Sequence, residues 1–422
     1  MRICTAREAI AATVQNGCQI FVQGGAATPS LLLAALAERA ATLSNVGVTH
    51  LHCEGAAPHL RPEMAGHLRH RALFIGANAR QAVNEGRADY VPVFLSEVPG
   101  LFRRGGLPVD VAFINVSPPD AHGLCTLGLS VDVTVAAVRA AKVVVAQINA
   151  AMPRVFGDGM IHLDQIHFGV PADEPPAAAA AHVTTDVEAR IGQRIAELVP
   201  DGATLQLGIG ALPGAICAAL AGKRDLGIHS EMISDGVVDL VERGVINGSR
   251  KEHDRGKIVA AFALGSARLY RFLDDNPSVE LRSADYTNDP GLIRQFSKMV
   301  AINSAIEIDL TGQVCSDSIG ERLFSGVGGQ VDFLRGAALA DDGRAIIALP
   351  ATAATFSRIV VELKPGAGVV TTRAHVHTVV TEYGVAELHG RGIGERARAL
   401  IAIAAPHYRD ALTAAARRLR YL

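Results

Sequence analysis

An internal repeat constrains the fold of this chain more than any other feature. The first copy starts at residue 16 with NGCQIFVQGGAATPSLLLAALA, and the second starts at residue 201 with DGATLQLGIGALPGAICAALA. Each copy has a turn pair, an apolar strand, a glycine cluster, a proline (Pro29 or Pro213) and an apolar helix. A repeat of this length predicts two domains built on one plan. Strand–glycine–helix units are common in α/β proteins, so chance similarity stays open as the alternative.

The segment between the copies has the composition of a domain boundary. Residues 169–186 read GVPADEPPAAAAAHVTTD, which is rich in Pro and Ala and poor in large apolar side chains. The stretch that follows, VEARIGQRIAELV, has the periodicity of an amphipathic helix. A chain of 422 residues is also long for one core. We therefore expect an N-terminal domain at 1–180 and a C-terminal domain at 181–422.

Both halves alternate short β-rich runs with helical stretches. The runs expected as buried strands are VDVAFINVS, KVVVAQI, KIVAAFAL, AIIALP and VVTT, and the expected helices include SLLLAALAERAATL and PGAICAALAG. This alternation predicts an α/β fold of two similar domains, each a mostly parallel sheet flanked by helices. Ligands of such sheets bind beyond the carboxyl ends of strands, where the pair Gly24-Gly25 and the run from Gly208 to Gly210 lie.

Composition and charge exclude several classes of protein. Hydrophobic residues make up 49% and charged residues 19%, which is globular, and the net charge of −2 provides no basic surface for nucleic acid or membrane. The first residues have no apolar signal-peptide core, and the apolar runs are shorter than a membrane span. The six cysteines are not closely paired, which argues against a CxxC zinc site or a disulfide framework. We expect a cytoplasmic protein with reduced thiols.

Two glycine-rich segments are candidate anion sites. LQLGIGALPGAI follows an expected strand and opens an expected helix, and the free N–H groups there suit a phosphate or an oxyanion. Gly208, Gly210 and Gly214 also give a weak dinucleotide fingerprint, in which the third glycine is misplaced by one residue. A tight strand–helix turn is the alternative. SGVGGQVDF, at residues 325–333, favours an anion-binding nest over a plain loop.

Glu231 is the carboxylate with the most unusual context. It lies in GIHSEMISDG, near the end of an expected buried strand and before an expected turn at Asp235-Gly236. A nucleophile is one interpretation and a solvated surface carboxylate is the other. The carboxylates that compete with it are Glu54, Glu307, Asp309 and Glu382. Glu307 and Asp309 are two residues apart, which is typical of a solvated strand face.

Two His-x-His pairs are candidate metal ligands. His50 and His52, and likewise His375 and His377, could each place two imidazoles on one face of a strand. The sequence assigns no third ligand to either pair. We interpret all four as ordinary strand histidines and expect no metal ion. A Gly-x-Ser-x-Gly elbow is absent from the sequence, and nothing identifies a Ser-His-Asp triad.

Ordered motifs along nearly the whole chain carry a family resemblance. In the C-terminal half they are LQLGIGALPGAI, GIHSEMISDGVVDLVERGVI, YTNDP, AINSAIEIDLTGQVCSDSIG, SGVGGQVDFLRGA and ERARALIAIAAPHYRDAL. In the N-terminal half they are VQGGAATPSLLLAAL, GANARQAVNEGRADYVPVFLSEVP and VDVAFINVSPPDAHGLCTLGLSVD. The chain resembles the acetyl-CoA hydrolase/transferase family of glutamate-dependent coenzyme A transferases, closest to the 4-hydroxybutyrate and butyrate–acetate CoA-transferases. The resemblance implies an active site between the two domains.

The resemblance implies roles for individual residues. Glu231 matches the catalytic glutamate of the family, and Gly329 matches a backbone donor to the thioester oxygen. Asn288 matches an asparagine that orients the glutamate, and Ile306 an apolar position against the CoA arm. The implied CoA-binding residues are Gly208, Ile209, Gly210, Ala211, Leu212, Asn288, Ile306 and Gly329. One departure is Ala405, where relatives usually have histidine before the proline.

The implied activity is transfer of CoA from a short-chain acyl-CoA to a carboxylate through a glutamyl-CoA thioester on Glu231. No permanently bound cofactor is expected, since coenzyme A is a substrate and a transient covalent adduct. We expect a homodimer or a higher homo-oligomer with no nucleic-acid or membrane partner. An acyl-CoA hydrolase, a nicotinamide-dependent oxidoreductase and a non-catalytic CoA sensor are the alternatives. Acetyl, propionyl, butyryl, 4-hydroxybutyryl, succinyl and itaconyl groups all remain open as the acyl group.

Overall fold

The computed structural model describes residues 1–180, 182–208 and 210–422. The chain forms two compact units, and neither is one continuous segment. The first unit comprises Met1–Ala180, Val259–Thr287 and Phe324–Gly328. The second unit comprises Ala181–Ile258, Asn288–Leu323 and Gly329–Leu422. The domain limits expected from the sequence, 1–180 and 181–422, assign residues 259–287 and 324–328 to the C-terminal domain. These limits stay a prediction.

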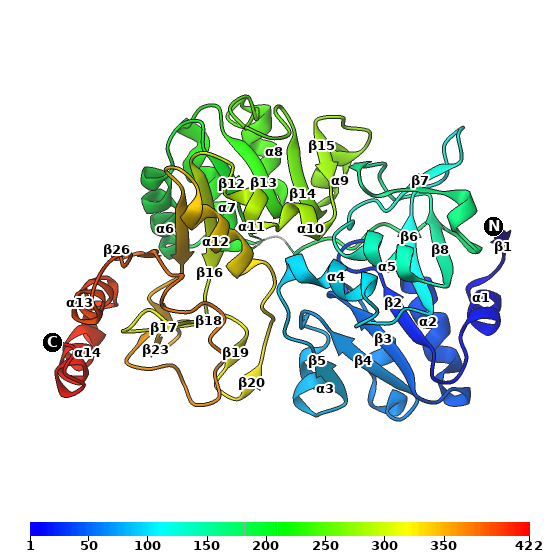
Figure 1. The fold of residues 1–422 in the computed structure, drawn as a ribbon, viewed down its shortest axis with the longest axis horizontal. Helices are drawn as coiled ribbons and strands as arrows, with labels where there is room; N and C mark the ends of the chain where they lie inside the picture. The colour runs from blue at the N-terminus through cyan, green and yellow to red at the C-terminus, as the bar shows by residue number, and fades with distance from the viewer. Residues whose placement is uncertain (181, 209) are drawn as a thin grey trace. The chain divides into compact units, whose positions relative to one another are not determined.

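The first unit is built on an eight-stranded sheet in the order β1-β11-β8-β6-β2-β3-β4-β5 (Figure 1). Every pair of neighbours in it is parallel. Its strands are β1 (Arg2–Ile3), β2 (Gln19–Val22), β3 (Val46–His50), β4 (Leu68–Ala72), β5 (Ala88–Tyr90), β6 (Val111–Val116), β8 (Val143–Asn149) and β11 (Phe168–Ala172). The main helices are α1 (Ala6–Thr13), α2 (Ser30–Arg39), α3 (Arg80–Asn84), α4 (Val98–Arg103) and α5 (Thr134–Ala140).

Later segments of the chain complete the first unit. They contain most of β14 (Ile258–Ala263), then α9 (Ala267–Leu273), β15 (Val279–Leu281) and α10 (Ala284–Thr287). β15 pairs in parallel with β9 (Phe156–Gly157), and β7 (Leu124–Thr126) pairs antiparallel with β10 (Met160–His162).

The second unit carries the strand order β26-β25-β21-β16-β12-β13. Neighbours are parallel except for the antiparallel pair of β25 and β26. The strands are β12 (Thr204–Gln206), β13 (Gly227–Ile233), β16 (Met299–Ser304), β21 (Arg344–Ala348), β25 (Thr378–Thr381) and β26 (Gly384–Glu387). The helices are α6 (Asp186–Leu198), α7 (Ala211–Ala219), α8 (Asp235–Glu242), α11 (Pro290–Ile293), α12 (Gln330–Leu339), α13 (Ile393–Ile403) and α14 (Pro406–Arg418). A small sheet has the order β18 (Val314–Cys315), β17 (Glu307–Asp309), β24 (Ile359–Val360).

The two copies of the sequence repeat fold alike. In the first, β2 leads through a loop to α2 and on to β3, and β2 pairs with β3 and β6. In the second, β12 leads through a loop to α7 and on to β13, and β12 pairs with β13 and β16. Each central strand therefore has one neighbour that follows directly and one that comes later in the chain. The α/β prediction, with parallel sheets flanked by helices, is confirmed.

Local features explain where the elements begin and end. Helix α6 begins at a capping box, in which the Thr185 side chain accepts from the Glu188 N–H and the Glu188 carboxylate accepts from the Thr185 N–H. Helix α7 follows Gly210, whose φ of 104° and ψ of −172° lie in a region essentially restricted to glycine. Both sheets pack apolar side chains against helices, and the cores contain Phe113 of β6 in the first unit and Phe333 of α12 in the second.

Three local predictions from the sequence are wrong. Asp235-Gly236 is not a turn, because both residues belong to the first turn of α8. The stretch that follows them is amphipathic, and the helix buries its apolar face. The run VVTT at 369–372 forms no strand, and only Thr371 makes an isolated bridge, to Val314. The expected linker starts too early, since Phe168–Ala172 forms β11 and pairs with β8.

Candidate active site

Glu231 lies within β13, near the carboxyl end of the strand. It is half-buried, whereas Ser230 and Met232 on either side of it are buried. A carboxylate on a buried parallel strand is unusual, because most charged side chains are solvated. Glu231 is therefore the partly exposed residue between two buried neighbours.

Asn288 and Gly329 complete a close group around this carboxylate. The Asn288 side-chain amide donates from Nδ2 to Glu231 Oε2 at 3.1 Å, and Asn288 itself is 0% exposed. Gly329 is so close that a Cβ added to it would lie 2.1 Å from both Glu231 Oε2 and Asn288 Nδ2. These three residues come from separate parts of the sequence. The folding of the second unit brings them together.

Secondary structure fixes each member of the group. Asn288 precedes Asp289, whose side chain caps α11 by accepting from the Gly291 N–H. Gly329 is the N-cap residue of α12, so it lies at a helix end where N–H groups lack acceptors within the helix. Gly328 has a φ of 56° and Gly329 a φ of −100°. Two successive residues whose φ angles have opposite signs adopt the backbone conformation of an anion-binding nest.

The first glycine loop is held against the strand that carries Glu231. The Ser230 hydroxyl donates to the Leu207 carbonyl at 3.0 Å, and its oxygen accepts from the Leu207 N–H at 3.2 Å. Gly208 follows Leu207 directly, and Gly210 caps α7. Ala211 and Leu212 are half-buried in its first turn. Sequence reasoning missed Ser230, although its place beside Glu231 was a signal.

The remaining predicted residues are placed less tightly. Ile306 is half-buried just beyond the carboxyl end of β16, where its N–H donates to the Cys315 carbonyl. Ile209 lies outside the described residues. Strand order reverses between β16 and β12, and ligands in such sheets bind at this kind of reversal. Gly208 lies just beyond the carboxyl end of β12, and Ile306 lies just beyond that of β16, so both are at this reversal.

The competing carboxylates have structural partners. Asp309 accepts from the N–H and hydroxyl of Thr311 and from the N–H and side chain of Gln313. Glu307 accepts from the Lys364 N–H at 3.0 Å. Both carboxylates are only 2% exposed, so the prediction of a solvated face is wrong. Their hydrogen bonds offset the cost of burial.

The other two carboxylates are also engaged within their own units. Glu382 is 6% exposed and accepts from the Ala351 N–H at 2.8 Å. Glu54 is half-buried and lies 3.4 Å from His52 Nε2. Glu231 differs from all four because its carboxylate lies against Gly329, the N-cap residue of α12.

Of the four histidines expected in strands, only His50 lies in one. β3 ends at His50, and His52 beyond it packs against Phe74 and Phe262. His375 bonds to Thr372, while His377 stacks on His389 with ring centroids 3.9 Å apart. Neither of these two lies in a strand. Ala405, where relatives usually have histidine, is the N-cap of α14 and is 1% exposed.

Comparison with known proteins gives matches over nearly the whole chain. The N-terminal domain of the acetyl-CoA hydrolase/transferase family matches residues 1–181, and its C-terminal domain matches residues 265–416. A succinyl-CoA:acetate/propanoyl-CoA:succinate CoA transferase of Fasciola hepatica is 50% identical over 96% of this chain and 85% of its own length. A 4-hydroxybutyrate coenzyme A transferase of Clostridium kluyveri is 47% identical over 97% of this chain and 96% of its own.

Solved structures show the same fold. The crystal structure of RipA from Yersinia pestis has a TM-score of 0.94 and 35% identity, covering 100% of this chain and 98% of that chain. A 4-hydroxybutyrate CoA-transferase from Porphyromonas gingivalis has a TM-score of 0.86 and 40% identity, covering 99% and 98%.

Proposed function

This chain belongs to the acetyl-CoA hydrolase/transferase family, and from that premise we propose that it is an acyl-CoA:carboxylate CoA-transferase with Glu231 as its nucleophile. The single observation that carries the assignment of Glu231 is its contact with Asn288 and Gly329. Curated relatives named as CoA-transferases are 35–50% identical over 91–99% of the chain. Those named acetyl-CoA hydrolase are 26–30% identical. Transfer is therefore favoured over hydrolysis.

The proposed reaction proceeds through two kinds of covalent intermediate on Glu231, an anhydride and a thioester. The Glu231 carboxylate attacks the thioester carbonyl, which forms an acyl-glutamyl anhydride and releases CoA thiolate. The thiolate attacks the glutamyl carbonyl, which forms a glutamyl-CoA thioester and releases the first carboxylate. A second carboxylate then attacks this thioester, which forms a new acyl-glutamyl anhydride and releases CoA thiolate. The thiolate attacks the acyl carbonyl of this anhydride, which releases the Glu231 carboxylate and yields the new acyl-CoA.

Each residue of the group has a proposed part in this sequence. Asn288 holds one oxygen of Glu231, so the carboxylate is oriented before attack. The N–H of Gly329 stabilises the oxygen that becomes negative on the thioester carbonyl. Gly208, Ile209, Gly210, Ala211, Leu212 and Ile306 bind coenzyme A. No other cofactor takes part in the proposed reaction.

The cellular setting is proposed with the same function. The substrates are acyl-CoA and short-chain carboxylates, and the protein acts in the cytoplasm as a homodimer or a higher homo-oligomer. In the part of the chain that the structure describes, no helix has the length and apolarity needed to cross a membrane. A screen of acetyl-CoA and succinyl-CoA against carboxylate acceptors distinguishes the substrates left open. The same screen without acceptor measures hydrolysis.

Borohydride trapping tests the covalent route. Incubation with acyl-CoA alone forms the glutamyl-CoA thioester, and borohydride reduces a thioester but not a carboxylate. We expect acyl-CoA-dependent inactivation, conversion of Glu231 to the alcohol by peptide mass analysis, and parallel initial-rate plots. Excess acceptor should protect the enzyme. A modified residue elsewhere would refute the role of Glu231, and convergent plots without inactivation would refute the covalent mechanism.

Substitution of Asn288 by aspartate tests the orienting contact. The new carboxylate would face Glu231 across about the present 3.1 Å, and two like charges at that distance favour retention of one proton. Activity at neutral pH should fall about tenfold or more, and the acid limb of the pH profile of kcat/KM should move to higher pH. An unchanged profile in a folded variant would contradict the contact. Asp289→Asn at the neighbouring cap is the control.

A further inference from the structure

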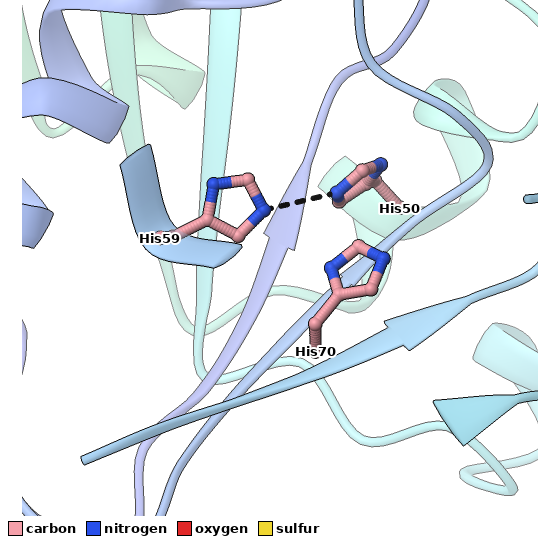
Figure 2. Close-up of side chains that lie close together, drawn as sticks. All are labelled: His50, His59 and His70. Carbon is pink, nitrogen blue, oxygen red and sulfur yellow. Dashed lines mark hydrogen bonds between the residues drawn. The ribbon is translucent and has the colours of Figure 1, made fainter. Parts of the chain in front are cut away.

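Three histidines converge in the core of the first unit (Figure 2). His50 is the last residue of β3, His70 lies in the middle of β4, and His59 lies in a short 3₁₀ helix, η2 (Pro58–Leu60). Their exposed fractions are 1%, 2% and 2%. The sequence motif groups His50 with His52, but in the structure His50 lies close to His59 and His70.

Sheet geometry explains why His50 and His70 meet. β3 and β4 are parallel, and His70 lies opposite Val48, two residues before His50. Residues two apart share a face of the sheet, so His50 and His70 point to the same side. η2 contacts both β4 and α2, and this brings His59 over the same face.

The distances fit a small metal ion. His50 Nε2 and His59 Nε2 are 3.3 Å apart, and one ring nitrogen from each of the three histidines lies within 4.8 Å of the others. A tetrahedral zinc ion with Zn–N bonds of about 2.05 Å separates its ligands by about 3.3 Å. The first two rings already have this spacing. The centroid of the His70 ring lies 4.3 Å from that of His50 and 5.4 Å from that of His59.

Burial without partners also indicates a missing ligand. Among the residues that the structure describes, Nδ1 of His50, Nδ1 of His59 and both ring nitrogens of His70 have no hydrogen-bond partner. Buried polar atoms in this state destabilise a fold unless something satisfies them. Burial lowers the pKa of His59 to about 4. It also lowers the pKa of His50 and of His70, with neighbouring histidines adding to the effect. Neutral imidazole is the form that binds metals.

We propose that His50, His59 and His70 form a binding site for a zinc-type divalent ion, with water or hydroxide as the fourth ligand. The proposal replaces the expectation of no metal ion, because the structure supplies the third ligand that the sequence does not assign. The ion would join β3, β4 and the segment at 51–67, so its role is structural within the first unit. The proposal does not depend on the reaction proposed for Glu231, which belongs to the second unit.

Metal analysis of the full-length, tag-free protein tests this site. The protein is treated with a chelator, loaded with Zn²⁺ or with Co²⁺, and freed of excess metal by dialysis. We expect about one ion per chain, and the cobalt form should show the intense visible bands of four-coordinate cobalt. Zinc at a hundredfold excess over its Kd should raise Tm by about 5 °C.

Three single variants and a control identify the ligands. His50→Leu, His59→Leu and His70→Leu each roughly keep the volume of the side chain and remove both ring nitrogens. Each should lose the cobalt bands and the zinc-induced shift in Tm. Without metal, His70→Leu should melt within a few degrees of wild type, because both nitrogens of the ring that it removes have no hydrogen-bond partner. His50→Leu and His59→Leu should melt lower than His70→Leu, because each also breaks the 3.3 Å contact between the two Nε2 atoms. His122→Ala, at an exposed position of the same unit, should keep both signals.

Two results would overturn the proposal. The first is that wild-type protein holds no ion after dialysis, which would leave the 3.3 Å contact as a hydrogen bond between neutral tautomers. Alternatively, the leucine variants could retain the cobalt bands, which would place the ion at other residues. If one leucine variant does not fold, the wild-type spectrum and the other two variants still decide the question.

Discussion

Replacement of Glu231 by glutamine is expected to reduce CoA transfer by about three orders of magnitude or more, because the amide is not a nucleophile. The fold should be unaffected. Glutamine has the same shape as glutamate, and its carbonyl oxygen can still accept from Asn288 Nδ2, which lies 3.1 Å from Glu231 Oε2. Measurement of kcat/KM beside a thermal melt separates the loss of chemistry from loss of folding.

A matched carboxylate variant controls for the change of charge. Glu54→Gln removes one negative charge from a half-buried position in the first unit and should keep near wild-type turnover. A Glu231→Gln protein with near wild-type activity would move the nucleophile to another carboxylate. Borohydride trapping would then identify it.

Substitution of Gly329 is expected to have the second largest effect. A Cβ at this position would lie 2.1 Å from Glu231 Oε2 and from Asn288 Nδ2, so valine, or even alanine, must displace both groups. A displacement of about 1 Å can cost about a hundredfold in rate. We expect Gly329→Val to lower kcat/KM by about a hundredfold or more. Stability should change less, since the φ of −100° is open to any residue.

A second glycine provides the comparison. A Cβ on Gly222 meets no atom within 4 Å, so Gly222→Ala should leave kcat/KM unchanged. Gly329→Ala should fall between wild type and the valine variant, because its side chain is smaller. Unchanged kinetics in a folded Gly329→Val protein would show that the nest residue takes no part in the reaction.

Local sequence patterns predicted many of the elements and the parallel arrangement of the sheets. The repeat at 16 and 201 predicted two strand–loop–helix units, and the structure shows β2–α2 and β12–α7 with matching parallel neighbours. Apolar periodicity located α6 within one residue at each end. Such patterns succeed because each depends on residues close together in the chain.

The same reasoning failed where local patterns were ambiguous. VVTT at 369–372 has high β propensity, but the strand of this region is β25 at Thr378–Thr381. Asp235-Gly236 is a common turn pair, yet it opens α8, because the apolar residues that follow have helical spacing. Propensity is a weak preference, and tertiary packing overrides it.

The sequence by itself determined the family, the α/β fold and the choice of Glu231 as the residue to test, because ordered motifs and apolar periods are properties of the chain. Only the tertiary structure decided which side chains meet. Asn288 contacts Glu231 across 57 positions of sequence, and Gly329 abuts both. His70 joins His50 through the register of β3 and β4. Contacts of this kind depend on strand order and register, which local spacing does not contain.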